Sequence, residues 1–405
     1  MTQSVKPTIP TQSMGTRIYH KHFKIDWFVL SERMTQSSTD LQKRLVALTR
    51  DLILIPTDAS RPDDIERGFE FVINHVESLD NIVVNKYYHC DIPSLVALPK
   101  GLKHPKVLLC GHIDVITHPD SHSYRSQIAD GRIVGPGSAD MKGPLAILLE
   151  IFMNLHMQHD NLPLGLAITS DEERGGNAGM RFLFDEVGLR CGVAMIPDGG
   201  SLNEITVEEK GILHLNIQCN GHSSHAARPW LGNNPLERIV DATARLRENF
   251  DSLKTDEYHW HPTCALTIIK TANQTVNRIP SEAEATLDIR FPAPYTVKEM
   301  LNHVRNLLGE EINTHTIISA EPTLLSPDPL YLTVTEEVTG KSTSQEKEDG
   351  GSDARFIGRL NIPVIVSRPL VGELHSTDEW IDIKSMETFY KIYELYLKRK
   401  LLSDN

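Results

Sequence analysis

Helix-forming and strand-forming segments alternate along most of this chain, and the alternation is the strongest constraint on its fold. Apolar residues recur at helical spacing in 41–55 and 64–79, and short apolar runs typical of buried strands follow at 81–88 and 107–110. The same alternation continues between residues 143 and 197. It predicts an α/β fold in which helices cover both faces of a mixed, largely parallel sheet.

The rhythm changes after Glu209, where the predicted order becomes strand, helix, strand, strand, helix, strand up to residue 320. That order is typical of the split βαβ, ferredoxin-like unit. After residue 321 the first pattern returns, and it ends in an amphipathic helix at 383–401. We therefore expect a second domain inserted into the first. The predicted boundaries are 1–33 for an N-terminal extension, 34–209 and 322–405 for the two parts of the main domain, and 210–321 for the insertion.

Two segments fall outside the alternating pattern. The polar, charged run from Gly340 to Gly351 predicts a loop. Near the N-terminus, the tetrapeptide at residues 1–4 recurs at residues 34–37, directly before the first periodic helix. We expect Met34 to be the natural start of the protein, and a short extension from Met1 that packs on the surface is the alternative.

The composition bears on partners and location. A formal net charge of −13 argues against a nucleic acid as partner, because a phosphate-binding surface needs clustered Lys and Arg, and solubility is the simpler reason for the charge. The five cysteines form no C-x-x-C pair, which favours a reducing, cytoplasmic setting over a disulfide framework. No apolar run approaches the ~20 residues of a spanning helix, so we expect no membrane partner.

Side chains of the types that commonly bind metal ions follow the predicted strands. His112 comes directly after the apolar run at 107–110, at the strand end where open α/β sheets place their ligand sites. Asp114 lies two residues further on, where its carboxylate can accept the other imidazole N–H and fix the tautomer of His112. A His-x-Asp pair alone is a weak signal, because most such pairs are surface or turn residues.

Further metal-ligand side chains occur in comparable places, and each has an ordinary alternative role. Asp140 opens a helix and is suited to an N-cap, while Asp198 closes a strand and is suited to a turn. The adjacent Glu172 and Glu173 can form a solvated acidic turn, although paired carboxylates are costly unless cations or a shared proton compensate. His375 is one of 18 histidines.

The joint pattern is more specific than any of its members. It contains two histidines and four carboxylates, most of them at predicted strand ends. A two-metal site needs one bridging carboxylate, a histidine and a carboxylate for each ion, and one carboxylate left free as a base. The series therefore predicts a two-metal amide hydrolase.

These segments resemble the co-catalytic zinc metallopeptidase family that includes glutamate carboxypeptidase, aminoacylase, acetylornithine deacetylase, succinyl-diaminopimelate desuccinylase, carnosinase and tripeptidase. The resemblance covers the chain from about Met34 onward. It implies two Zn²⁺ ions, with Co²⁺ or Mn²⁺ as substitutes. One ion is then held by His112 and Asp198, the other by Glu173 and His375, and Asp140 bridges them. The peptide bond after Asp140 is expected to be cis.

The resemblance also implies roles beyond the metal ligands. Glu172 is expected to be the general base and Asp114 to support the site. The main domain becomes the catalytic domain, and the insertion becomes a lid that also joins two copies into a homodimer. His225, which competes with His222, is expected to hold the developing oxyanion, often from the dimer partner. The expected substrate-binding residues are Asn277, Arg290, Gly351 and Ser352, although Arg290 alone reads equally well as an exposed strand residue.

The substrate follows less directly. Deacylases and carboxypeptidases of the family tend to carry Glu where this chain has Asp198, which favours an exopeptidase or dipeptidase acting on a small peptide with a free carboxylate. The alternative is an N-acyl amino acid deacylase of the acetylornithine deacetylase or succinyl-diaminopimelate desuccinylase type. A more remote alternative is a catalytically silent metal-binding paralogue. The segment Trp230–Pro235 departs from the more usual Gly-x-Asn-Ala.

Overall fold

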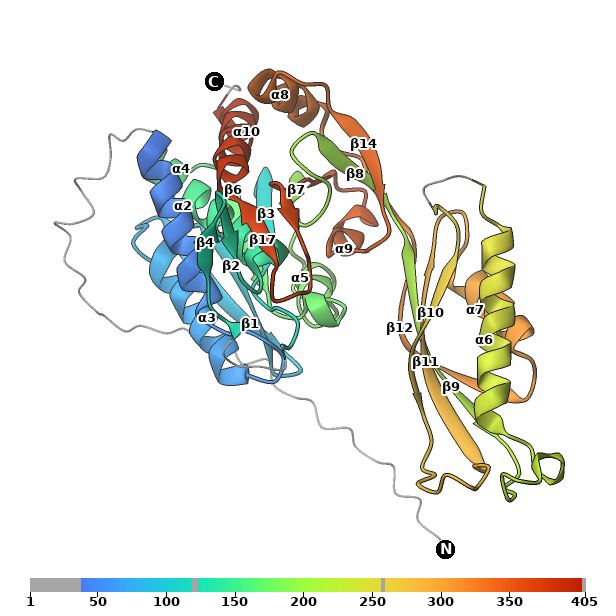
Figure 1. The fold of residues 1–405 in the computed structure, drawn as a ribbon. Coiled ribbons are helices and arrows are strands. Elements are labelled where there is room, and N and C mark those ends of the chain that lie inside the picture. Colours follow the sequence, from blue (N-terminus) through green and yellow to red (C-terminus); the bar gives the residue numbers. More distant parts are fainter. Residues whose placement is uncertain (1–37, 119–122, 256–258, 403–405) are drawn as a thin grey trace, which may run out of the picture.

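The main body of the protein is built around a six-stranded sheet (Figure 1). The computed structural model describes residues 38–118, 123–255 and 259–402. The strands of this sheet, in spatial order, are β1 (Ile82–His89), β2 (Ile92–Pro99), β6 (Leu164–Thr169), β3 (Val107–His112), β7 (Val193–Ile196) and β15 (Val364–Val366). The last four run parallel, whereas β1 and β2 are antiparallel to their neighbours. The predicted α/β class with a largely parallel sheet is confirmed.

Helices cover both faces of this sheet, which explains why its central strands are apolar throughout. In β3, Val107 and Leu109 join one core, and Leu108 and Cys110 join a second core on the opposite face. The first core contains residues of α2 (Ser38–Ile53), α3 (Pro62–Val76), α4 (Gly143–Gln158), α8 (Pro329–Thr339) and α10 (Ile383–Leu402). The second contains residues of α5 (Met180–Asp185) and α9 (Ala354–Gly358).

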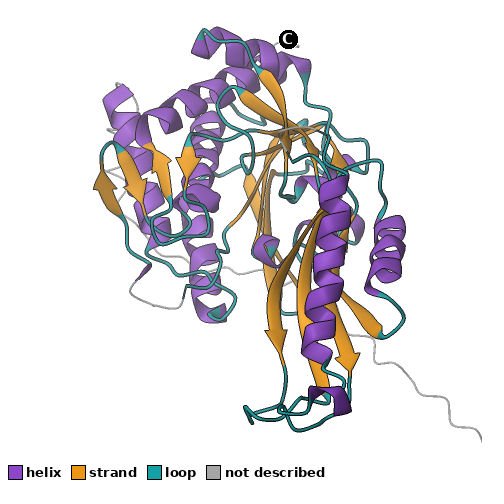
Figure 2. Cartoon of the chain, turned by 45° about the vertical axis from the view of Figure 1, so that its right-hand side comes forward, coloured by secondary structure: helices purple, strands orange, loops and turns teal. Residues whose placement is uncertain are grey.

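Residues 211–320 form a separate antiparallel sheet with its own apolar core. The chain order is β9 (Gly211–Asn220), α6 (Pro235–Ser252), β10 (Thr263–Lys270), β11 (Glu282–Phe291), α7 (Val297–Leu308) and β12 (Ile312–Ala320). The strands lie in the order β10-β11-β9-β12, which is ferredoxin-like connectivity. Figure 2 shows a long helix lying along these strands, and the sheet stands apart from the main body in Figure 1.

Two smaller sheets complete the fold. One has the order β13 (Thr323–Leu324), β8 (Glu204–Glu209) and β14 (Ser344–Glu348), and it lies where the chain enters and leaves the segment 211–320. The other has the order β16 (Val371–Gly372), β17 (Trp380–Asp382), β5 (Arg132–Val134) and β4 (Gln127–Ala129). Through the pairing of β17 with β5, the segment that follows His375 lies beside the segment that precedes Asp140.

One predicted loop is wrong in part. The run from Gly340 to Gly351 contains strand β14, which pairs in parallel with β8. Its side chains are mostly exposed and polar, so the strand leaves no apolar alternation in the sequence. The remaining predicted helices and strands begin and end close to the expected positions. The strand predicted at 81–88 is nevertheless not a buried one, because β1 lies at the edge of the sheet and none of its residues is fully buried.

Two further expectations concern the ends of the chain and membranes. Met1, Met34 and the whole predicted extension at 1–33 lie outside the described residues. Within residues 38–118, 123–255 and 259–402, no helix is both long enough and apolar enough to span a membrane.

Candidate metal centre

The predicted ligands converge at one edge of the main sheet. His112 is the last residue of β3, Glu172 and Glu173 open a short 3-10 helix after β6, and Asp198 follows β7. These three strands are neighbours and run parallel, so their carboxyl ends meet at the same edge. This is where open α/β sheets bind ligands.

The two remaining predicted ligands come from loops. Asp140 lies in the short helical segment Ser138–Lys142 that precedes α4, and His375 lies between β16 and β17. The peptide bond between Asp140 and Met141 is cis, as the resemblance implies.

The ligand atoms form two adjacent groups. One contains His112, Glu172 and Asp198, and the atoms within it lie no more than 4.8 Å apart. The other contains Asp140, Glu173 and His375, within the same limit. Geometry alone therefore leaves Glu172 two possible roles, as a ligand or as a base beside the ligands.

Asp140 belongs to the second group and also contacts the first. Its Oδ1 atom is 3.0 Å from Nε2 of His112, and its Oδ2 atom is 3.3 Å from Nε2 of His375. The same His375 nitrogen lies 3.4 Å from Oε2 of Glu173. Each oxygen of one carboxylate thus faces a histidine of a different group, which is the arrangement that a bridging ligand requires.

Asp114 supports both His112 and the segment that carries the paired glutamates. Nδ1 of His112 lies 3.0 Å from the backbone oxygen of Asp114 and 3.5 Å from its carboxylate Oδ1. The other carboxylate oxygen accepts a hydrogen bond from the backbone N–H of Glu173, at 3.1 Å. The carbonyl is therefore the nearer partner that orients the imidazole and leaves Nε2 facing the cluster.

The electrostatics of the cluster point to bound cations. Burial raises the pKa of Glu172 well above its usual range, and the Asp198 carboxylate raises it further. Burial likewise raises the pKa of Asp198, with Asp140 adding to the effect. Hydrogen bonds to Asp140 and Glu173 raise the pKa of His375 to about 10. The fold thus brings several carboxylates close together, and the neighbouring imidazoles bind protons that balance the negative charge.

Metal ions would relieve this repulsion better than protons do. Four carboxylates outnumber the two imidazoles even when both imidazoles are protonated. Imidazole nitrogens and carboxylate oxygens are suitable donors for zinc and similar divalent ions, which bind after these groups lose their protons. The residues present therefore fit divalent metal ions.

Three charged residues near the centre were missed by the sequence reasoning. Asp353 is buried, and its Oδ2 atom accepts a hydrogen bond from Thr169 at 3.3 Å; burial raises its pKa to about 7. Nη1 of Arg368 lies 3.9 Å from Oδ1 of Asp198. Glu379 binds the loop that carries Asp140. Arg368 follows strand β15, so its strand-end position was the one signal that could have found it.

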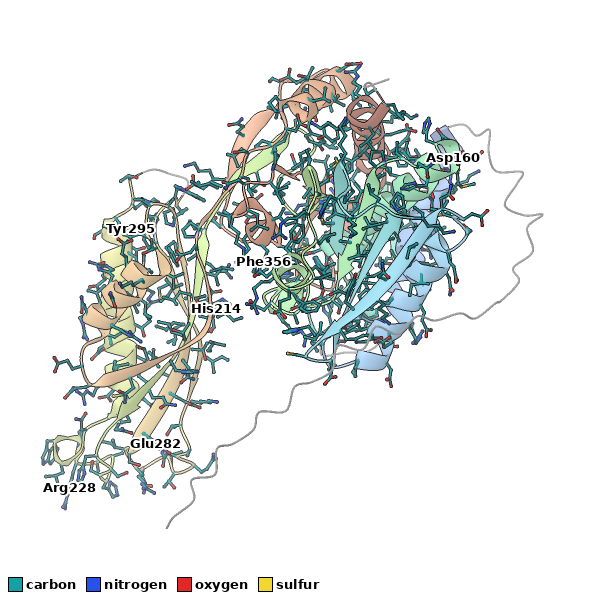
Figure 3. All side chains as sticks on the ribbon, turned by 180° about the vertical axis from the view of Figure 1, so that it is seen from behind. Asp160, His214, Arg228, Glu282, Tyr295 and Phe356 are labelled. Atoms are coloured by element: carbon teal, nitrogen blue, oxygen red, sulfur yellow. The ribbon has the colours of Figure 1, made fainter. Side chains whose placement is uncertain are left out.

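His225 and Asn277 are not brought to the metal centre. The backbone oxygen of His225 accepts a hydrogen bond from Arg228, and that of Asn277 accepts one from Ala226. Arg228 lies at the end of the inserted sheet furthest from the main body (Figure 3). Both side chains are exposed. Within one chain, His225 therefore lies far from the cluster, and the role that the resemblance implies would need a second copy.

The other expected substrate-binding residues lie nearer the junction between the two sheets. Arg290 is next to Ile212 in the register of β11 and β9, and its guanidinium binds Asp288 at 2.7 and 3.1 Å. Gly351 faces Ile212 as well. The hydroxyl of Ser352 donates to Oε1 of Glu209 at 2.6 Å, so this side chain is already engaged.

Glu209 gives a prediction about stability and pH. It is buried at the end of β8, and its Oε2 atom has no hydrogen-bond partner among the described residues. Burial raises its pKa from 4.5 to about 7. Between these pH values the folded protein holds a proton that the unfolded chain releases, so Glu209 destabilises the fold as the pH rises through this window, by about 3 kcal/mol at most.

We expect Glu209→Gln to remove this loss. The free energy of unfolding of the variant, measured by urea titration at fixed metal concentration, should match that of the wild type near pH 4 and exceed it at pH 8. The exposed Glu204 of the same strand gives the control, because Glu204→Gln should follow the wild type at both pH values. Parallel curves for Glu209→Gln and the wild type would contradict the prediction.

Comparison with known proteins identifies a family with which this chain shares its sequence pattern. Residues 108–399 match the model of a family described as peptidase family M20/M25/M40. A succinyl-diaminopimelate desuccinylase of Rhodospirillum centenum is 28% identical over 391 residues, which cover 87% of this chain and 96% of the relative. The desuccinylase of Nitrosomonas eutropha is 29% identical over 328 residues, covering 75% and 86% of the two chains.

Solved structures show the same fold at lower identity. The di-peptidase Dug1p of Saccharomyces cerevisiae has a TM-score of 0.72 and 15% identity, with 91% of this chain and 98% of that chain covered. The metallo-carboxypeptidase Sso-CP2 of Sulfolobus solfataricus has a TM-score of 0.71 and 17% identity, with 88% and 98% covered. Human carnosine dipeptidase 1 has a TM-score of 0.69 and 15% identity, with 90% and 98% covered.

Proposed function

We propose a function from the family to which this chain belongs, peptidase family M20/M25/M40. The relatives described above are hydrolases of amide bonds. We propose that this protein is a two-zinc exopeptidase or dipeptidase acting on small peptides with a free carboxylate. The observation that carries the proposal is the Asp140 carboxylate, whose two oxygens face His112 and His375. Co²⁺ or Mn²⁺ would serve as substitutes for zinc, since the same nitrogen and oxygen donors bind them.

Each ligand has a role in the proposed site. His112 and Asp198 would hold one ion, Glu173 and His375 would hold the other, and Asp140 would contribute one oxygen to each. Bound divalent ions polarise the substrate carbonyl and lower the pKa of a water molecule to about 7. Asp114 keeps Nε2 of His112 directed at the site through the contact of its backbone oxygen with Nδ1.

Glu172 is the proposed general base. It lies beside the ligands of the first group and is partly buried at the end of β6. Its carboxylate takes a proton from the attacking water and returns it to the leaving nitrogen. Its carboxylate lies within 4.8 Å of ligand atoms of His112 and Asp198, which places it beside the ion that these residues would hold.

The inserted sheet is proposed to complete the site as a lid and as the surface of a homodimer. His225 is exposed at its far end, so a second copy of the chain must supply this side chain if it is to stabilise the oxyanion. Asn277 lies beside the same segment and would bind the substrate carboxylate with it. Arg290 would bind the same carboxylate from the junction between the two sheets, after giving up part of its hydrogen bonding to Asp288.

A second function is supported by the sequence relatives. Both desuccinylases described above remove an acyl group according to their name, and they align with most of this chain. The alternative is therefore an N-acyl amino acid deacylase with the same metal centre. Asp198 is the residue that favours the peptidase, because the resembling deacylases tend to carry glutamate there.

A substrate panel separates the two functions. We expect the zinc-loaded or cobalt-loaded protein to hydrolyse dipeptides or tripeptides with a free C-terminal carboxylate, and to lose most of this activity on the corresponding C-terminal amides. Chelation of the metal should abolish hydrolysis. N-succinyl and N-acetyl amino acids are the comparison substrates, and cleavage of these alone would establish the deacylase. A fully metal-loaded protein with no activity on either class would favour a silent metal-binding paralogue.

A further inference from the structure

Glu379 is a buried carboxylate that the proposed ligand set does not include. It lies four residues after His375, directly before β17, and only 2% of it is exposed. Its Oε1 atom accepts hydrogen bonds from the backbone N–H groups of Ala139 and Asp140, at 2.7 and 2.8 Å. Its Oε2 atom accepts a third from Gly137, at 3.0 Å. One carboxylate therefore binds three donors of the loop that carries the bridging ligand.

The backbone of Glu379 binds the same loop. Its carbonyl oxygen accepts hydrogen bonds from the N–H of Gly135, at 2.8 Å, and from the hydroxyl of Ser138, at 2.9 Å. The next residue, Trp380, then pairs with Val134 in the ladder of β17 and β5. The segment with His375 and the loop with Asp140, which are more than 230 residues apart in sequence, are thus joined into one unit.

These contacts require a carboxylate rather than any polar side chain. All three backbone partners are N–H donors, so both oxygens of the side chain must accept. Glutamine has one accepting oxygen, and its NH₂ group would face a donor in the other position. Hydrogen bonds to an ionised acceptor are also shorter and about twice as strong as neutral ones. Substitution by glutamine keeps the shape of Glu379 and removes this complementarity.

The contact with Asp140 is the one that bears on the metal centre. The N–H that Glu379 binds belongs to the same residue whose Oδ2 atom lies 3.3 Å from Nε2 of His375. Asp140 has extended rather than helical dihedral angles within a helical segment, so its neighbours in the chain do not fix it as a regular helix would. Glu379 supplies that constraint from the His375 segment.

We propose that Glu379 is a positioning residue that sets Asp140 and His375 in register for the second metal ion. The inference rests on the proposed two-metal function. A positioning role and a purely structural role predict different effects. A residue that only holds the two loops together would change the stability of the protein, but it would not change the affinity for one ion more than for the other.

The test compares Glu379→Gln with Asp378→Asn, the exposed carboxylate next to it. Zinc binding to the metal-free proteins is measured by calorimetry, and the visible absorption of the cobalt-loaded proteins reports the ligand geometry. Supporting residues of this kind typically contribute 10–100-fold to metal affinity. We expect Glu379→Gln to weaken one of the two binding events about 10–100-fold and to alter the cobalt spectrum, while the other event, which also has His112 and Asp198, is weakened less. Asp378→Asn should match the wild type.

A second variant covers the case in which Glu379→Gln does not fold. Glu379→Asp keeps both accepting oxygens on a shorter stem, so it should fold and show an intermediate loss of affinity at the same ion. Two binding events of wild-type affinity and an unchanged cobalt spectrum in both variants would overturn the inference about Glu379. That outcome would not contradict the proposed hydrolase function. Conversely, a wild-type protein that binds two ions but hydrolyses none of the panel substrates would refute the proposed function, not the role of Glu379.

Discussion

Glu172→Ala is expected to abolish nearly all amide hydrolysis while both metal ions stay bound. The side chain lies beside His112 and Asp198, and its pKa is raised by burial and by the charge of Asp198. A base placed in this way contributes about 10²–10⁴-fold to the rate, because it removes a proton from water and donates it to the leaving nitrogen. The loss should fall on kcat, since alanine leaves the residues that bind the substrate unchanged.

The same variant decides between the two roles that geometry leaves open for Glu172. If this carboxylate is a ligand of the first ion, the variant will lose metal together with activity. Elemental analysis of the purified protein, alongside steady-state kinetics, therefore gives the answer. Glu186→Ala is the matched control, because Glu186 is exposed, lies in the same part of the chain and should be dispensable. Retained turnover in a fully loaded Glu172→Ala protein would refute the assignment as base.

His375→Ala should reduce the metal content from two ions to one. The imidazole supplies the only nitrogen of the second ligand group, where it lies within 3.4 Å of both Asp140 and Glu173. Without it, the carboxylates of Asp140 and Glu173 lose the imidazole that lies close to both of them. The first group keeps His112 and Asp198, so it should still bind one ion.

Elemental analysis and a zinc-dependent thermal shift test this prediction. A ligand that binds only the folded protein raises the unfolding temperature, so the loss of one ion should reduce the shift that zinc produces. His104→Ala removes an exposed histidine of the main body and serves as the control. An unchanged content of two ions in His375→Ala would show that the second ion is held without it.

The ends of the central strands were the most informative part of the sequence. His112, Glu172 and Asp198 each follow a short apolar run, and neighbouring parallel strands place such residues at one edge. The ferredoxin-like order after Glu209 was readable for a similar reason, because its strands and helices keep a clear apolar period. Local pattern and tertiary position agree at these places.

Elsewhere the local sequence pattern contained no information about which distant residue a side chain contacts. Nothing around Glu379 shows that it binds backbone groups near Asp140, because its partners are N–H donors that every residue except proline has. The placement of Asp140 between His112 and His375 likewise depends on contacts between segments that are far apart in the sequence. Strand β14 was missed because an exposed, polar edge strand needs no apolar face.

The chain enters and leaves the segment 211–320 at neighbouring positions, and this has a consequence for how the protein is assembled. Glu209, at the end of β8, is the direct partner of Thr323 in an antiparallel ladder. A short hairpin turn could join two such residues, so the main body does not depend on the insertion for its connectivity. The segment 211–320, which has its own apolar core, and the sheet that carries the predicted metal ligands are therefore encoded in separable stretches of sequence, and one can be exchanged without rerouting the other.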